Sequence, residues 1–166
     1  MIQCGARRLA VAAVLACLLC GATSAAHAAV SCSASATGPA FGVYSPTASL
    51  ATTATGTVTV TCSLLNGGAT TVNLTVSLNS GSSGSFGSRT MQSGTSQLKY
   101  NIYRSPAYLQ IWGDGTGGSY YSTSSIALSH TTRTASSSGT MYGQVPAGQD
   151  VAPGTYLDTI TVTVNY

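Results

Sequence analysis

Within the last eleven residues, 159–166 alternate strictly between polar and apolar side chains. One face of 156–166 carries β-branched and aromatic residues, namely Ile160, Val162, Val164 and Tyr166. The opposite face carries Thr159, Thr161, Thr163 and Asn165. This two-residue period predicts a half-buried β-strand. Because chain ends usually fray, a terminal strand with so regular an apolar face is expected to pair with another strand.

The same period recurs at 57–62, 71–78 and 98–103, where Val, Leu and Ile alternate with Thr, Asn and Ser or with Lys and Tyr. Clusters of Asn, Gly and Ser at 66–68 and 79–81 separate these segments and predict turns. No stretch shows helical periodicity over three turns. The sequence therefore predicts an all-β, antiparallel sandwich or barrel.

Two segments lack this alternation. Residues 80–88 are rich in Gly and Ser and predict a mobile loop. Residues 131–139 are rich in Ser and Thr, and the pattern leaves open whether they form a strand.

The first 28 residues have the layout of a secretory signal peptide. Arg7 and Arg8 precede an apolar run over 9–19, and Ala26-His27-Ala28 forms a small-x-small cleavage signal. The apolar run is too short to span a bilayer. We therefore expect residues 1–28 to be removed during export, and 29–166 to form one domain with no membrane span.

Other interpretations of this segment remain open. Cleavage after Ser24 also fits the pattern of small residues. A lipoprotein signal ending at Cys17 is a weaker alternative.

The expected mature domain is almost neutral. The whole chain has six basic and three acidic residues, and removal of Arg7 and Arg8 leaves four basic side chains against three acidic ones. Binding to nucleic acid or to acidic lipid requires clustered Lys and Arg, so neither is expected. Low charge also removes a common defence against association between protein surfaces.

Two cysteines remain after cleavage, Cys32 and Cys62. In an exported chain the simplest expectation is one disulfide between them. Two free thiols are the alternative. A zinc site is less well supported, because His130 would be the one histidine left to help bind the metal.

The mature segment offers little catalytic chemistry. General acid–base catalysis needs a titratable pair in a cleft, and the domain contains His130 and three aspartates. It has no G-x-S-x-G motif to hold a nucleophile. Asp114 lies in a Gly-rich stretch without a second carboxylate at calcium-ligand spacing, which favours a tight turn. We expect no enzyme, no metal and no cofactor.

One aromatic group could bind a ligand. Trp112, together with Tyr120 and Tyr121, could form a platform for a sugar ring. A single Trp beside an isoleucine is more often part of a core or an anchor for a turn. A secreted carbohydrate-binding module therefore stays as the alternative function.

Several short motifs follow one another along the chain in a fixed order. They are Cys32 with Ala36-Thr37-Gly38, Phe41-Gly42-Val43-Tyr44, the segments 54–62 and 98–103, Arg89-Thr90-Met91, Trp112-Gly113-Asp114-Gly115, and the segments 142–149 and 153–158. With these motifs, residues 29–166 resemble the spore coat protein U domain. That domain is shared with subunits of archaic, Csu-type chaperone–usher pili.

The resemblance implies an immunoglobulin-like, pilin-like β-sandwich that is incomplete as synthesised. It also implies partners: a periplasmic chaperone, an outer-membrane usher and other pilus or coat subunits, on a route through the periplasm to the cell surface. The chaperone would pair with the terminal strand that carries Ile160, Val162, Val164 and Tyr166. An ordinary sandwich strand without a partner would show the same alternation.

One departure from the polymerising members concerns the start of the mature chain. Those members carry a donor segment of a dozen or so residues before their first cysteine. Here three residues precede Cys32 after cleavage at Ala28, or seven after cleavage at Ser24. At about 3.3 Å per residue such a segment is too short to fill a neighbour's groove. The sequence therefore favours a tip, terminal or coat component over a shaft subunit.

Overall fold

The computed structural model describes residues 28–166. The expected signal peptide therefore lies outside the described residues, except for Ala28. The described chain contains eight strands and one 3-10 turn, η1 (Gly81–Ser83). The strands are β1 (Ala29–Thr37), β2 (Thr52–Asn66), β3 (Thr70–Leu78), β4 (Arg89–Ser93), β5 (Ser96–Tyr103), β6 (Ser122–Leu128), β7 (Thr134–Val145) and β8 (Val162–Asn165).

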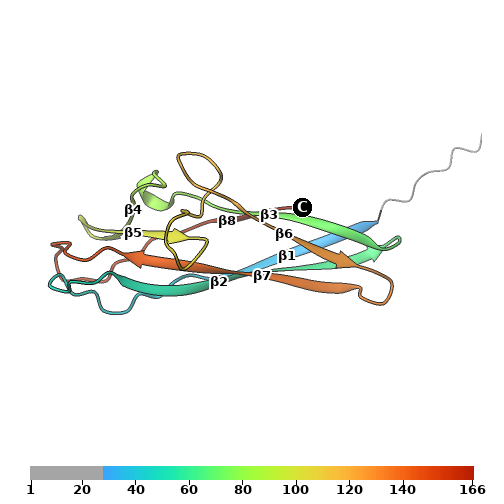
Figure 1. Ribbon diagram of the computed structural model, residues 1–166, viewed down its shortest axis with the longest axis horizontal. Helices are drawn as coiled ribbons and strands as arrows, with labels where there is room; N and C mark the ends of the chain where they lie inside the picture. Colours follow the sequence, from blue (N-terminus) through green and yellow to red (C-terminus); the bar gives the residue numbers. More distant parts are fainter. Residues whose placement is uncertain (1–27) are drawn as a thin grey trace, which may run out of the picture.

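These strands form two antiparallel sheets. The first has five strands in the order β1-β2-β7-β5-β4, and the second has three in the order β6-β3-β8. Figure 1 shows an elongated molecule in which the long strands β2 and β7 run side by side along most of its length. The expected all-β antiparallel sandwich is confirmed.

The core lies between the sheets and follows the predicted alternation. Its buried side chains come from one face of each long strand: Val58, Val60, Cys62 and Leu64 of β2, Val72, Leu74, Val76 and Leu78 of β3, and Leu98, Tyr100 and Ile102 of β5. Burial of these apolar faces supplies the main driving force for folding.

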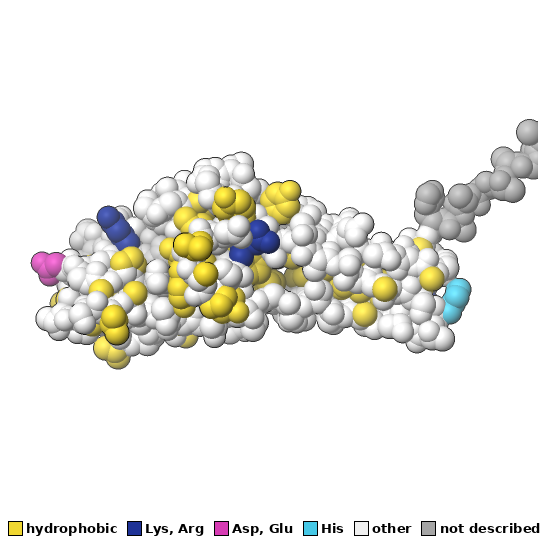
Figure 2. Space-filling model, in the orientation of Figure 1, with side chains coloured by type: hydrophobic (Ala, Val, Ile, Leu, Met, Phe, Trp, Pro, Cys, Tyr) yellow, Lys and Arg dark blue, Asp and Glu magenta, His cyan; other side chains and the backbone are white. Residues whose placement is uncertain are grey.

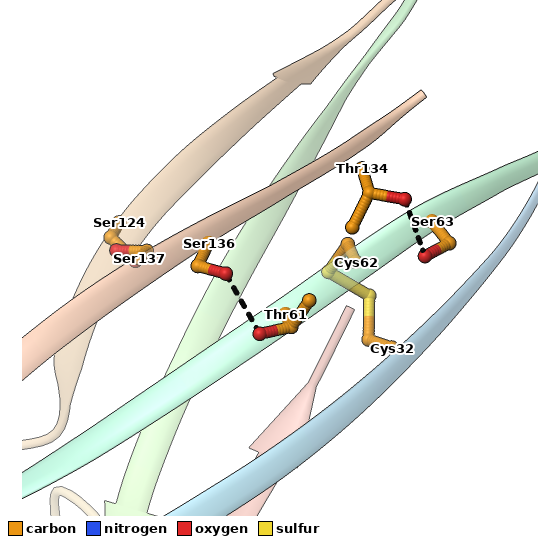
Figure 3. The surroundings of a disulfide bond; sticks show 8 residues. All are labelled: Cys32, Thr61, Cys62, Ser63, Ser124, Thr134, Ser136 and Ser137. Atoms are coloured by element: carbon orange, nitrogen blue, oxygen red, sulfur yellow. Dashed lines mark hydrogen bonds between the residues drawn. A yellow bond between two sulfur atoms is a disulfide. The ribbon is translucent and has the colours of Figure 1, made fainter. Parts of the chain in front are cut away.

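The disulfide ties β1 to its neighbour. Cys32 and Cys62 are directly opposed in the β1–β2 pairing and are bonded to each other, as expected (Figure 3). Their Cα atoms are 4.0 Å apart. The bond fixes the edge strand β1 to the centre of the five-stranded sheet, because β2 also pairs with β7.

The outer face of this sheet is a regular array of hydroxyl groups. Rows across β1, β2 and β7 contain only Ser and Thr: Ser31–Ser63–Thr134, Ser33–Thr61–Ser136, Ser35–Thr59–Ser138 and Thr37–Thr57–Thr140. Side-chain hydrogen bonds join β2 to β7 at Thr59–Ser138 (2.9 Å), Thr61–Ser136 (2.8 Å) and Ser63–Thr134 (3.0 Å). Figure 3 shows the last two of these pairs beside the disulfide. Such cross-strand pairs contribute a few tenths to about 1 kcal/mol each.

The Ser/Thr-rich segment that the pattern left open is a central strand, β7. Its inward positions near the start are small residues, Ala135, Ser137 and Gly139, so the apolar alternation is missing there. Ser137 donates a hydrogen bond to the Ser124 hydroxyl at 3.0 Å. A Cβ atom at Gly139 would lie 3.1 Å from the ring of Trp112, which fills the space that a larger side chain would occupy.

A buried arginine, Arg89, connects the loop that follows β3 to β5 and to the turn at Trp112. Arg89 has no exposed surface, and its guanidinium donates to the carbonyl oxygens of Asn79 (2.6 and 3.2 Å) and Trp112 (2.8 Å) and to Oδ1 of Asn101 (2.8 Å). Its Cζ lies 5.3 Å from the centre of the Phe86 ring. The Gly/Ser-rich loop predicted to be mobile is therefore fastened to β4, β5 and the Trp112 turn.

Burial lowers the pKa of Arg89, and the nearby groups Tyr100, Asp158 and Asp114 oppose that shift. The group stays a cation, because an arginine side chain is not deprotonated in proteins. The carbonyl oxygens and the side-chain amide oxygen that accept its hydrogen bonds stabilise the positive charge, a role that a carboxylate plays in an ion pair.

Removing the disulfide should destabilise the domain. Replacing both Cys32 and Cys62 by alanine is expected to lower the free energy of unfolding by about 2–5 kcal/mol, since the unfolded chain loses a cross-link. Pulse proteolysis of the exported protein at increasing urea concentration, in fresh periplasmic extract where any partner stays bound, measures the loss, and reduction of the unaltered protein should reproduce it. An unchanged midpoint, or two alkylatable thiols in the exported protein, would contradict this expectation.

Replacing the buried arginine should cost more. Arg89→Met keeps the bulk of the side chain but leaves its buried carbonyl and amide acceptors unpaired, so we expect a loss of at least about 3 kcal/mol. The fluorescence of Trp112, the one tryptophan in the chain, reports unfolding directly. The matched control is Lys99→Met on the exposed face of β5, which should change stability by no more than about 0.5 kcal/mol. Equal effects of the two substitutions would show that Arg89 has no special role.

Candidate functional site

An apolar groove of about 970 Å³ opens into the sandwich beside β8. Its floor consists of core side chains from three strands, namely Met91 of β4, Leu98, Tyr100 and Ile102 of β5, and Met141 and Val145 of β7. Its walls are the connection that follows β1 and the segment that leads into β8. The groove therefore reaches down to the core, although the side chains of its floor keep at most 9% of their surface exposed.

The walls place large apolar side chains in solvent. Val43, from the connection after β1, is 95% exposed, and Leu157, from the segment before β8, is 71% exposed. Phe41 of the same connection lies edge-on to Tyr100 on the groove floor, with ring centres 5.9 Å apart. Exposed apolar side chains gathered around a groove are typical of an interaction site.

The terminal strand is shorter than the sequence pattern predicts, and the apolar face that the pattern predicts to be buried is only partly buried. Strand β8 covers Val162–Asn165 and pairs with β3, while its other edge has no neighbouring strand among the described residues. Ile160, Val162 and Val164 are half-buried against the core, and Tyr166 is 61% exposed. Of these four residues, Ile160 and Val162 line the groove.

The strand order explains the open edge. An immunoglobulin-type sandwich has one sheet of strands A, B, E and D and another of C, F and G. Here β1, β2, β7 and β5 occupy the positions of A, B, E and D, and β3 and β8 those of C and F. Within residues 28–166, no strand occupies the position of G beside β8. The groove adjoins this position at Ile160 and Val162.

A partly buried carboxylate–phenol pair links the groove wall to its floor. The Tyr100 hydroxyl donates to Oδ2 of Asp158 at 2.7 Å. Oδ1 of Asp158 accepts hydrogen bonds from the backbone amides of Ser82 (3.0 Å) and Thr159 (2.9 Å). Burial, followed by the hydrogen bond to Asp158, raises the pKa of Tyr100, so the phenol keeps its proton.

Asn79 connects the Arg89 network to the approach of the last strand. The backbone carbonyl oxygen of Asn79 accepts hydrogen bonds from Arg89. Its side-chain Oδ1 accepts from the backbone amide of Thr161 at 2.9 Å, and its backbone amide donates to the Thr161 carbonyl at 3.1 Å. The alternation of side chains did not reveal these polar anchors. The one signal in the sequence for this network was a single arginine, Arg89, after the Gly/Ser-rich loop. Because arginine side chains are usually exposed, its burial could not be predicted from that signal.

The candidate catalytic and metal residues are not brought together. His130 is exposed between β6 and β7. Asp114 closes a turn, and hydrogen bonds to its carboxylate from the hydroxyl and amide of Thr116 hold its pKa below the usual value. Among residues 28–166, no group of three His, Cys, Asp or Glu side chains could hold a metal ion. In the same part of the chain, no helix has the length and apolar character to span a membrane.

The platform for a sugar ring, which the sequence left as an alternative, does not include Trp112. Trp112 is 2% exposed, and its Nε1 donates to the Val76 carbonyl at 3.0 Å inside the core. A buried indole has no free face for a sugar ring. Tyr120 and Tyr121, by contrast, are about half exposed.

Comparison with known proteins agrees with this architecture. The structure is similar to a chain in the crystal structure of the CsuC–CsuE chaperone–tip adhesion subunit pre-assembly complex from archaic chaperone–usher Csu pili of Acinetobacter baumannii, with a TM-score of 0.52 and 21% identity. The similarity covers 83% of this chain and 40% of that one, so this chain spans well under half of that neighbour's length. At this level of identity the likeness establishes the fold.

No curated protein matches the sequence. The family comparison is more direct, because the Spore Coat Protein U domain matches residues 19–163, which include every strand of the first sheet and most of the second. The chain belongs to the spore coat protein U domain family.

Proposed function

We propose that this chain is a structural subunit of a surface pilus or coat, assembled by the chaperone–usher route. The observation that carries the proposal is the apolar groove beside the edge of β8 that has no strand neighbour within residues 28–166, where a sandwich of this topology would place another strand. Family membership and the likeness to a Csu pilus subunit support it.

The groove offers what a donated strand requires. In strand addition, backbone hydrogen bonds to an open sheet edge supply affinity, and alternate side chains fill successive pockets. Strand β8 supplies the open edge, and the core residues of β4, β5 and β7 supply an apolar floor. Filling the groove would remove this apolar surface from water at about 25 cal/mol per Å².

The proposed partners are a periplasmic chaperone, an outer-membrane usher and other subunits of the same assembly. The solved neighbour is a subunit captured with its chaperone before assembly. By analogy, a chaperone strand would pair with β8 beside Ile160, Val162, Val164 and Tyr166 while the subunit waits in the periplasm. Export would follow from the signal peptide expected at residues 1–28.

A terminal, tip or coat position fits the start of the domain better than a shaft position. Strand β1 begins at Ala29 and is paired with β2 through Thr37, so these residues belong to the subunit's own sheet. Cleavage after Ala28 would leave no free segment to donate. The domain would then accept a strand from another protein but would not donate one to a neighbouring subunit.

Strand addition at the groove can be tested with one pair of substitutions. Val162→Asp places a carboxylate in the apolar groove, whereas Thr163→Asp places the same charge on the outer face of β8. With a Csu-type chaperone co-expressed, Val162→Asp should lower the periplasmic yield at least about tenfold, because an unpaired buried charge costs several kcal/mol. Thr163→Asp should retain the yield.

Expression without the chaperone completes that test. The unaltered domain should aggregate or be degraded, since its groove and the edge of β8 are exposed. A domain that is monomeric, soluble and cooperatively folded by itself would show that the fold needs no donated strand, and the proposed assembly mechanism would fail.

The terminal position makes a separate prediction about the exported protein. Intact mass measurement should place its first residue at Ala29, or at Ala25 if cleavage follows Ser24. Purified subunits released from the chaperone should then stay unpolymerised, because a segment this short cannot span a groove. Fibres formed from this subunit alone would contradict the terminal position.

A further inference from the structure

A second pocket, of about 450 Å³, lies at the junction between the two sheets. It is formed where the chain leaves β5 and where it enters β6, and its lining consists of Arg104, Gly115, Ser119, Tyr120, Tyr121 and Thr123. None of these residues lines the groove beside β8. Any ligand of this pocket is therefore separate from the proposed strand acceptor.

Arg104 has a donor without an acceptor. Its Nε is buried and has no hydrogen-bond partner. An unpaired buried donor destabilises the folded state and is uncommon in a folded protein. Arg89 in the same domain has protein acceptors for its Nε and both terminal nitrogens.

The backbone around Arg104 is fixed, so the pocket does not depend on a loose loop. The Arg104 amide donates to the Gln110 carbonyl at 3.0 Å, and the preceding residue, Tyr103, pairs with Tyr142 of β7. The rings of Tyr103 and Tyr108 pack edge-on, with centres 5.5 Å apart. The side chain therefore leaves a rigid strand end.

Two tyrosines complete the pocket. Tyr120 and Tyr121 are 48% and 47% exposed, and backbone hydrogen bonds of 2.8 Å hold Tyr120 to Ile111 and Gly113. At Gly115 the backbone has a φ of +93°, and a Cβ atom there would lie 3.0 Å from the Tyr121 ring. A glycine at this position lets the loop pack closely against that ring.

The lining contains one cation and no carboxylate. The closest acidic residue in the sequence, Asp114, is engaged by Thr116 through its Oδ1. Most of the surface is uncharged: the face drawn in Figure 2 shows few charged side chains, and one Lys or Arg near its centre lies among hydrophobic ones. Within the lining an anionic group would meet the positive charge of Arg104, and the carboxylate of Asp114, one residue before Gly115, would oppose part of that attraction.

We propose that this pocket binds an acidic monosaccharide unit, with its carboxylate on Arg104 and its ring against Tyr120 and Tyr121. A guanidinium matches the planar, two-oxygen geometry of a carboxylate. Tyrosine rings offer apolar faces with a polar edge, which suit the C–H face and hydroxyls of a sugar. The Nε of Arg104 is buried, so the terminal nitrogens of the guanidinium would supply the donors for the carboxylate.

Binding is tested on the subunit bound to its chaperone, so that the groove is occupied and the fold is complete. Galacturonate, galactose and inorganic phosphate are titrated separately, and isotope-edited NMR follows the pocket residues. Galacturonate should shift the Arg104, Tyr120 and Tyr121 signals saturably, with an affinity at least about tenfold above that of galactose, as expected for a charge-assisted hydrogen bond.

Variants separate the two parts of the site. Arg104→Met should reduce galacturonate affinity at least tenfold, and Tyr121→Ala should weaken galacturonate without changing phosphate binding. Arg133→Met removes an exposed cation outside the pocket and should change neither. Each variant must still bind the chaperone, which shows that it folds.

Three outcomes would overturn the proposal. Equal affinity for galactose and galacturonate would exclude the carboxylate contact. Phosphate binding as tight as galacturonate binding, with no effect of Tyr121→Ala, would indicate a general anion site. The absence of a saturable shift with all three compounds would show that the pocket binds neither the sugars nor the anion. None of these results bears on strand acceptance, which depends on other residues.

Discussion

The rest of the structure depends on one constraint, which is that within residues 28–166 strand β8 has a strand neighbour on one edge and none on the other. Apolar side chains from β4, β5 and β7 form the floor of the groove beside it, and they keep at most 9% of their surface exposed. The large apolar side chains of the groove that lie in solvent are those of its walls, Val43 and Leu157. The proposed donated strand would pair with the free edge of β8 and cover these walls.

The remaining parts hold the open sandwich in shape. The Cys32–Cys62 bond fixes the edge strand β1, and Arg89 fastens the loop before β4 to the turn at Trp112. Asp158 anchors the groove wall to Tyr100. These anchors are covalent or polar, and they lie around the groove. They keep the groove formed in the domain by itself, and a preformed groove lowers the ordering cost of binding for a partner.

Sequence reasoning found the fold class and the core strands, because β2, β3 and β5 bury one face each and so show a clear two-residue period. It left β7 open, since Gly139 and its small neighbours contact Trp112 instead of carrying apolar side chains of their own. The burial of Arg89 depends on acceptors from distant segments that no local pattern reveals. The groove itself arises from strand order, which alternation does not encode.

Hydrogen exchange at the backbone amides of β8 tests the central claim most directly. The measurement compares the mature domain immediately after its release from a Csu-type chaperone, before it aggregates, with the same domain bound to that chaperone. If the vacant edge accepts a strand, alternate amides of Val162–Asn165 should exchange quickly in the isolated domain and become protected in the complex, because the donated backbone supplies their acceptors. Equal and strong protection of these amides without a partner would contradict the account.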